Sequence, residues 1–109
     1  MDLVAKRFDV WLVTLDPVQG SEIAKTRPCV IVSPDVLNHH LATVLVAPLT
    51  STIRNYPSRL NCTVAGKNGQ IALDQIRALD KSRLVQNIGA LNSITAFQMC
   101  ELLREMFEF

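Results

Sequence analysis

The sequence is poor in the residues that mark disulfide-rich and metal-binding proteins. Only three cysteines occur among its 109 residues, Cys29, Cys62 and Cys100, and no two of them form a CxxC pair. Closely spaced cysteine pairs are typical of disulfide frameworks and structural zinc sites. We therefore expect reduced, structural thiols, and we predict neither a metal site nor a cofactor.

The sequence also lacks long apolar runs and an excess of one charge. No stretch approaches the roughly 18 apolar residues of a membrane span. The first ten residues carry Asp2, Lys6, Arg7 and Asp9, where a signal peptide would be apolar. We expect a cytoplasmic protein that does not enter a membrane. The formal net charge is only +1, which by itself does not favour a nucleic-acid partner.

This average hides an uneven distribution of charge. Residues 50–85 hold six basic and two acidic residues, a net charge of +4, whereas residues 100–109 hold three glutamates and one arginine. A locally basic face could steer a short anionic strand to the protein. Surface charge of this density also occurs in proteins with no such partner, so the distribution alone does not decide the function.

Hydrophobic residues make up 49% of the chain, which is enough to bury one core, and we predict a single domain over residues 1–109. Short β-branched runs separated by turn residues indicate a mainly β fold, a sandwich or a small barrel. The predicted strands are residues 8–15, 28–33, 43–49, 58–64 and 70–79. A tight hairpin turn is expected in AGKNG, residues 65–69, with Asn68-Gly69 supplying its positive φ. The nearly continuous apolar runs PCVIVSP and TVLVAPL predict strands that are covered on both faces.

The hydrophobic period changes after Ser93. Ile94, Phe97 and Phe107 fall near one side of a helix, together with Cys100 or Glu101 and Leu103 or Arg104. This pattern predicts a C-terminal helix that closes the fold, with Asn92 or Ser93 as its N-cap. A second, short helical turn is expected within residues 36–42.

The first candidate for chemistry is Arg27. It ends a polar loop, residues 16–28, and stands where the chain enters a buried strand. A rigid strand end can hold a guanidinium where it meets a phosphate through two parallel hydrogen bonds. The alternative is an arginine whose aliphatic part covers the barrel rim, or one paired with Glu22.

Two more segments carry candidate groups. Thr50, Ser51 and Thr52 follow an apolar strand, and their hydroxyls could donate to phosphate oxygens or bond their own backbone. Asp74 lies within a predicted strand, where carboxylates are unusual. It is a candidate acid, base or orienting group, and the alternative is a structural ion pair with Arg27 or Arg77.

Other polar and aromatic residues have simpler interpretations. His39 and His40 are adjacent in a polar setting, which is typical of a surface turn rather than of general acid and base catalysis. Trp11 lies in an apolar strand, so we expect it in the core or an interface.

Taken together, these segments resemble the MazF/PemK-type toxins, the endoribonucleases of bacterial toxin–antitoxin pairs. The likeness covers nearly the whole chain, through DVWLVTLDPVQGSEIAKTRPCVIVSPD, TVLVAPLTST, YPSRL and LDQIRALDKSRL. It implies a mainly β fold, a small SH3-like, partly open barrel with a C-terminal helix. It also implies a homodimer, metal-independent cleavage of single-stranded RNA, and restraint by a labile, MazE-like antitoxin.

The resemblance also implies roles for particular residues. Arg27 and Thr50 match the positions that the family most consistently ties to cleavage, and Asp74 matches a carboxylate found in some relatives. Those relatives carry an arginine two positions earlier, where this chain has Ala72. Cleavage would proceed by attack of the 2′-hydroxyl and leave 2′,3′-cyclic phosphate and 5′-hydroxyl ends. We assign RNA binding to Gln19, Gly20, Ser21, Lys25, Ser51, Thr52, Arg54, Gln75, Arg77 and Lys81.

Three other functions fit parts of the sequence. A CcdB-like toxin of the same fold would bind a topoisomerase through its C-terminal helix and a tail such as MFEF. A plain β-barrel interaction module would explain the core but not the polar rim, and a degenerate nuclease would keep the fold alone. The TRP, PLTST and DQIR segments favour the nuclease.

Overall fold

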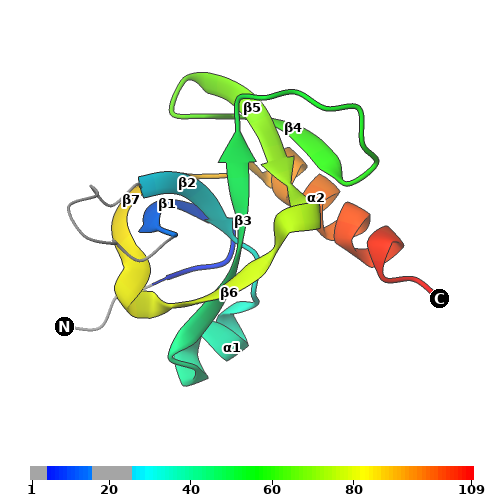
Figure 1. Ribbon diagram of the computed structural model, residues 1–109. Coiled ribbons are helices and arrows are strands. Elements are labelled where there is room, and N and C mark those ends of the chain that lie inside the picture. Colours follow the sequence, from blue (N-terminus) through cyan, green and yellow to red (C-terminus); the bar gives the residue numbers. More distant parts are fainter. Residues whose placement is uncertain (1–4, 16–25) are drawn as a thin grey trace.

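The computed structural model describes residues 5–15 and 26–109 (Figure 1). In chain order, its elements are β1 (Asp9–Thr14), β2 (Thr26–Ile31), α1 (Asp35–His40), β3 (Thr43–Thr50), β4 (Arg59–Val64), β5 (Lys67–Ala72), the 3₁₀ turn η1 (Leu73–Gln75), β6 (Arg77–Asp80), the 3₁₀ turn η2 (Lys81–Arg83), β7 (Leu84–Ala90) and α2 (Ser93–Met106).

The strands form one strongly curled antiparallel sheet. Its order is β4-β5-β3-β2-β1-β7, and β6 pairs with the other part of β3. Strands β1, β2, β3, β6 and β7 curl into a small barrel, and the β4–β5 hairpin stands beside it with α2 packed behind (Figure 1). The prediction of a mainly β, partly open barrel with a C-terminal helix is therefore confirmed.

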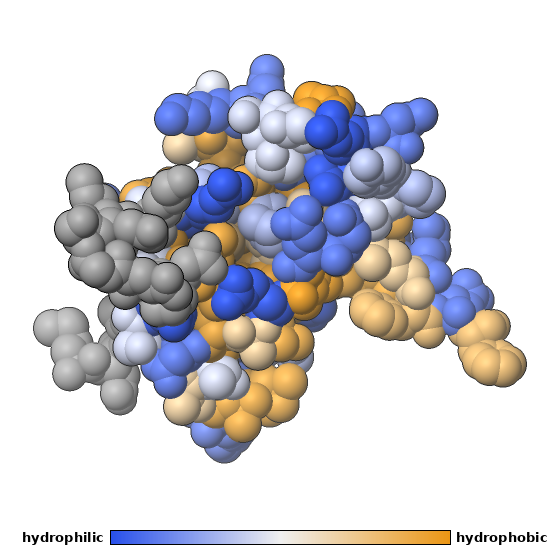
Figure 2. Space-filling model, viewed as in Figure 1, coloured by the Kyte–Doolittle hydropathy of each residue, from blue (hydrophilic) through white to orange (hydrophobic). Residues whose placement is uncertain are grey.

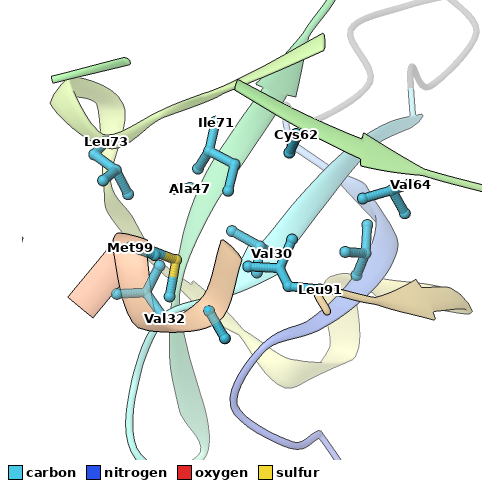
Figure 3. Close-up of a cluster of buried hydrophobic side chains, with 11 residues drawn as sticks. Val30, Val32, Ala47, Cys62, Val64, Ile71, Leu73, Leu91 and Met99 are labelled. Atoms are coloured by element: carbon cyan, nitrogen blue, oxygen red, sulfur yellow. The ribbon is translucent and has the colours of Figure 1, made fainter. Parts of the chain in front are cut away.

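The curled sheet buries side chains on both of its faces. Inside the barrel lie Ala5, Trp11, Val13, Cys29, Ile31, Val44, Val46, Leu79 and Leu84. The outer core lies between the barrel, the β4–β5 hairpin and α2, and Figure 3 shows its side chains converging there, Met99 of α2 among them. Cys29 and Ile31 of β2 point into the barrel while Val30 belongs to the outer core, so the expected coverage of both faces of this strand is confirmed. Trp11 lies in the core, which is one of the two locations expected for it.

The hairpin turn lies within the predicted segment 65–69, but Asn68 and Gly69 are not the residues that form it. The turn between β4 and β5 is formed by Ala65 and Gly66, whose φ angles are 51° and 76°. These two positive φ values are those of the tight turn that matches strand twist, and Val64 pairs with Lys67 directly beside it. Asn68 and Gly69 instead lie inside β5.

Residues 70–79 do not form the single strand that was predicted. The turn η1 divides the segment into β5, which pairs with β4, and β6, which pairs with β3. Asp74 therefore lies in a 3₁₀ turn and not, as predicted, within a strand. Strand β7 was not predicted, because only its first residue, Leu84, is buried and the rest of it lacks a clear apolar face.

Helix α2 begins where the sequence indicated. The side chain of Asn92 accepts a hydrogen bond of 2.8 Å from the Thr95 backbone N–H, which confirms it as the N-cap. The buried side of the helix, however, is formed by Thr95, Ala96 and Met99, while Ile94 and Phe97 are 71% and 66% exposed. The helical period was correct, but the predicted apolar side does not face the core.

The short helix α1 matches the helical turn expected near residues 36–42, and both of its histidines are exposed. Neither α1 nor α2, the helices in the described part of the chain, is long and apolar enough to cross a membrane.

Candidate functional site

Arg27 and Thr50 meet at the junction of two cavities. Pairing of Cys29 in β2 with Pro48 in β3 brings Arg27, two residues before Cys29, beside Thr50, two residues after Pro48. Both side chains line a larger cavity of about 680 Å³ and a smaller one of about 280 Å³, and Thr52 lines both as well. The two residues that the resemblance implicates in cleavage therefore share one place in the fold.

The smaller cavity is polar and rich in cations. Its lining comprises Arg27, Pro48, Thr50, Thr52, Arg54, Tyr56, Arg59, Ala72 and Gln75. Three guanidiniums converge there with hydroxyl and amide groups, and no carboxylate or imidazole belongs to this lining among the described residues. Such a set of donors is suited to a phosphate group.

The larger cavity combines an apolar floor with a polar rim. Leu12, Pro28, Leu49, Cys62, Val64 and Ile88 form the floor, at one open end of the outer core. Ser51, Thr52, Lys67 and Asn68 belong to the same lining and supply polar groups. An apolar pocket with a few polar groups fits a flat ring that carries polar edges.

Asp74 forms an ion pair with Arg59. The Arg59 Nε lies 2.8 Å from Oδ1 of Asp74, its Nη2 lies 3.3 Å from Oδ2, and the Ser58 hydroxyl donates to Oδ1 at 2.9 Å. The guanidinium also lies over the Tyr56 ring, 5.2 Å from its centroid. The expectation of a structural ion pair is met, but its partner is Arg59 rather than Arg27 or Arg77.

This ion pair changes the chemistry open to Asp74. The hydrogen bonds from Arg59, together with that from Ser58, lower the pKa of the carboxyl to about 2. A carboxylate with this pKa binds a proton weakly at neutral pH. Asp74 does not line either cavity, whereas Arg59, whose side chain is only 7% exposed, does. Asp74 therefore acts on the cavity through the position of Arg59.

The hydroxyl of Thr50 has one fixed partner. Its Oγ1 accepts a hydrogen bond of 3.1 Å from the Thr52 backbone N–H. The sequence analysis gave such a bond to the local backbone as the alternative to phosphate binding. Because the oxygen accepts here, its hydrogen can still be donated to a ligand.

The other residues assigned to RNA binding divide into three groups. Ser51, Thr52, Arg54 and Gln75 line one or both cavities. Arg77 and Lys81 line neither: Arg77 lies in β6, and the Lys81 ammonium donates to the Asn38 carbonyl of α1. Gln19, Gly20, Ser21 and Lys25, together with Glu22, lie outside the described residues.

Sequence analysis missed Arg59 and Lys67 as cavity residues. Arg59 stands in the YPSRL segment, and only the fold shows that it reaches Asp74, 15 residues further along the chain. Lys67 counted toward the basic stretch, and its place at the start of β5 puts it at the larger cavity.

Two of the three thiols are buried. Burial raises the pKa of the Cys29 thiol to about 12, and it also raises that of Cys62, so both thiols stay protonated at neutral pH. Among the described residues, no group of three or more His, Cys, Asp or Glu side chains could hold a metal ion.

Comparison with known proteins identifies the family. The family model described as PemK-like, MazF-like toxin of type II toxin–antitoxin system matches residues 6–107. The chain belongs to this family.

Individual toxins of this family agree with that result. The chain is 39% identical over 93 residues to the Endoribonuclease MazF of Staphylococcus saprophyticus, which covers 80% of this chain and 78% of that protein. A crystal structure of MazF from Deinococcus radiodurans has the same fold, with a TM-score of 0.79, 22% identity and coverage of 99% of this chain and 100% of that one. A mycobacterial endoribonuclease solved in complex with its cognate antitoxin gives a TM-score of 0.77 at 26% identity, covering 92% and 91%.

Proposed function

We propose that this toxin is an endoribonuclease that cuts single-stranded RNA at a short sequence without a metal ion. The observation that carries the proposal is the meeting of Arg27 and Thr50 at the junction of a cationic cavity and a largely apolar one. The first fits a phosphate and the second a base. The 39% identical relative is named an endoribonuclease, which supports the same activity.

The geometry supports cleavage by the RNA's own 2′-hydroxyl. This group loses its proton to solvent and attacks the adjacent phosphorus in line. The bond from phosphorus to the 5′-oxygen breaks and that oxygen takes up a proton from solvent, so the products carry a 2′,3′-cyclic phosphate and a 5′-hydroxyl. Arg27 stabilises the negative charge of the phosphorane and can donate toward the leaving oxygen. The Thr50 hydroxyl donates to a non-bridging oxygen, and a donor of this kind contributes on the order of 3 to 4 kcal/mol to lowering the barrier.

The remaining residues bind and position the strand in this proposal. Ser51, Thr52, Arg54 and Gln75 contact the RNA from the cavity walls. Asp74 is a positioning residue that holds Arg59, because its lowered pKa makes it a poor proton acceptor. The roles of Gln19, Gly20, Ser21, Lys25, Arg77 and Lys81 in RNA binding stay predictions.

We expect two protein partners, a cognate antitoxin and a second copy of this chain. A nuclease active on cellular RNA has to be restrained, and the mycobacterial relative was solved with its antitoxin. A homodimer would cover the apolar side chains that α2 and the C-terminal tail expose, which are Ile94, Phe97, Phe107 and Phe109. Figure 2 shows the C-terminal end of the chain as a hydrophobic projection. Because the proposed substrate is cellular RNA, we expect the protein to act in the cytoplasm.

The direct test incubates the native protein with a long single-stranded RNA of known sequence in the presence of EDTA. The proposal predicts recurring cuts at one short word, with 5′-hydroxyl ends. A substrate with a 2′-deoxy nucleotide before the cut should resist, because it lacks the nucleophile. Intact RNA at high protein concentration would refute the proposal and make binding to a topoisomerase the next activity to examine.

A further inference from the structure

The segment between β3 and β4 forms much of the smaller cavity without belonging to any regular element. Residues 51–58 have no strand or helix, and Thr52, Arg54 and Tyr56 all line the cavity from this segment. A loop without ladder hydrogen bonds holds side chains in place only if other groups fix its backbone. We refer to residues 51–56 as the cavity loop.

The buried side-chain amide of Gln70 in β5 forms two hydrogen bonds with the backbone in the middle of this loop. Its Oε1 accepts from the Arg54 backbone N–H at 3.0 Å, and its Nε2 donates to the Arg54 carbonyl at 3.2 Å. One side chain thus satisfies both the donor and the acceptor of one loop residue. The same Nε2 donates to Oδ1 of Asn61 in β4 at 3.0 Å. The amide has used both of its hydrogens and its oxygen.

The burial of Gln70 makes these bonds consequential. The residue is 5% exposed, so an amide that lost its partners would be left without water to replace them. A buried polar group with every bond satisfied specifies one arrangement of the chain around it. Here the specified element is the backbone of Arg54, whose side chain belongs to the cationic cavity.

We propose that Gln70 is a positioning residue for substrate binding, which latches the cavity loop and so holds Arg54, Thr52 and Tyr56 in place beside Arg27. This role in binding the RNA substrate rests on the proposed ribonuclease function. The side chain of Gln70 bonds the loop, whereas Thr50, its partner in the β3–β5 ladder, is held by backbone pairing, and Arg27 lies in β2. Loss of the latch should therefore weaken binding of RNA more than it slows the chemical step.

The first test examines the latch in the native protein, without reference to activity. Amide hydrogen exchange measured by NMR should be at least tenfold slower for Arg54 than for its neighbours Ile53 and Asn55, because only the Arg54 N–H among the three is held by a buried acceptor. Equal exchange at all three positions would overturn the latch.

The second test replaces Gln70 by methionine, which keeps the length and volume of the side chain and removes its hydrogen bonds. In Gln70→Met, exchange should accelerate across the cavity loop, and KM for a single-stranded RNA transcript should rise about tenfold while kcat changes less than threefold. Gln98→Met serves as the matched control, because Gln98 is exposed on α2 and lines neither cavity. Unchanged loop exchange and unchanged KM in Gln70→Met would overturn the proposal.

A third variant keeps the test decisive if Gln70→Met does not fold. Gln70→Glu keeps the acceptor for the Arg54 N–H but sets a carboxylate against two acceptor oxygens, those of Arg54 and Asn61. Its KM defect should shrink as the pH falls, since a protonated carboxyl can donate once more, and a pH-independent KM would contradict the latch. If the native protein cuts no RNA, the proposed function fails, while the exchange of Arg54 still decides the latch.

Discussion

At the scale of single residues, the site depends on how each charged group is held. Arg27 and Arg54 line the smaller cavity, and Arg59 reaches it while its charge is balanced by Asp74. The guanidinium of Arg59 is fixed by the carboxylate on one side and by the Tyr56 ring on the other. Such a paired arginine can shape the cavity wall without adding a full uncompensated charge.

The change Asp74→Asn separates positioning from proton transfer. A general base contributes about 100 to 10,000-fold to a rate, so its loss would stop cleavage and remove the acidic limb of the pH–rate profile. Because the pKa of Asp74 is lowered to about 2, we predict a loss of less than about tenfold, with an unchanged profile above pH 5. Steady-state cleavage rates between pH 5 and 9 provide the measurement.

Asp80→Asn is the control for this variant, because Asp80 accepts a hydrogen bond from the Ser82 N–H in η2 and lines neither cavity.

The pH dependence of stability gives a second test of Asp74. A lowered folded pKa means that the ion pair stabilises the fold above about pH 4 and that this contribution is lost as the pH falls toward 2. Asp74→Asn should lack this part of the acid destabilisation. A loss of cleavage beyond 100-fold would instead make Asp74 catalytic.

Gly69 controls the approach of β5 to Thr50. A Cβ at this position would lie 2.7 Å from the Thr50 carbonyl oxygen, so Gly69→Ala forces the two strands apart. We predict a loss of stability of about 1 to 3 kcal/mol and at least a tenfold fall in cleavage, because Thr50 shifts. Denaturant titration and cleavage rates together measure both effects.

Gly66→Ala is the matched control. Gly66 has a φ of 76°, so alanine there costs roughly 1 kcal/mol, but a Cβ would meet nothing within 4 Å. Its cleavage activity should stay near that of the native protein. If the two variants lose activity equally, the contact with Thr50 is not the reason.

At the scale of elements, α2 is held to the barrel by a narrow buried side. Met99 is fully buried in the outer core (Figure 3), to which Ala96 also belongs. The side of the helix that carries Ile94 and Phe97 is exposed. Met99, a long and flexible side chain, fills the space between the helix and the sheet, and Leu102 and Leu103 pack partly buried against the same core.

We predict that Met99→Ala lowers the free energy of unfolding by about 2 to 5 kcal/mol, because it leaves a cavity in the outer core. Urea titration followed by circular dichroism measures this value. Phe97→Ala, at an exposed position on the same helix, should cost less than about 1 kcal/mol under conditions in which the protein is monomeric. A cost at Met99 no larger than that at Phe97 would contradict this packing.

Local features of the elements were predictable from the sequence, and their mutual placement was not. The apolar run of β2 and the cap at Asn92 depend on neighbouring residues, so both were found. The exposed side of α2 was predicted to be its packed side, because the sequence does not show whether Ile94 and Phe97 face the core or the surface. Asn68-Gly69 is the stronger turn dipeptide, yet strand pairing places the turn at Ala65 and Gly66.

The candidate site shows the same division. Arg27 and Thr50 were identified by resemblance, through the order of short motifs along the chain. The ion pair of Asp74 with Arg59 joins two side chains 15 positions apart, and Gln70 bonds the backbone of Arg54, 16 positions away. No local pattern specifies either contact. Such contacts depend on the folded path of the chain.

At the scale of the whole molecule, the site lies where the barrel meets the β4–β5 hairpin. Arg27 pairs with Val13 of the barrel strand β1, whereas Thr50 pairs with Gln70 of β5, whose side chain also holds the cavity loop. Helix α2 packs on the outer core, and no residue of this helix lines either cavity. Arg54 and Arg59 of the basic stretch 50–85 supply two of the three cations of the smaller cavity, and Arg27 supplies the third. Lys67 of the same stretch lines the larger cavity, whereas Arg77 and Lys81 line neither.

The central claim is that Arg27 acts directly on the phosphate that is cut. The measurement that tests it most directly compares the native protein, Arg27→Ala and Arg104→Ala on one single-stranded RNA in EDTA, with mapping of the new 5′ ends. Arg104 is exposed on α2 and pairs with Glu101, so its loss controls for the substitution itself. We predict that Arg27→Ala, still folded, loses about 100 to 1,000-fold in rate while Arg104→Ala cuts the same word at the native rate. Equal cleavage by all three proteins would contradict the account.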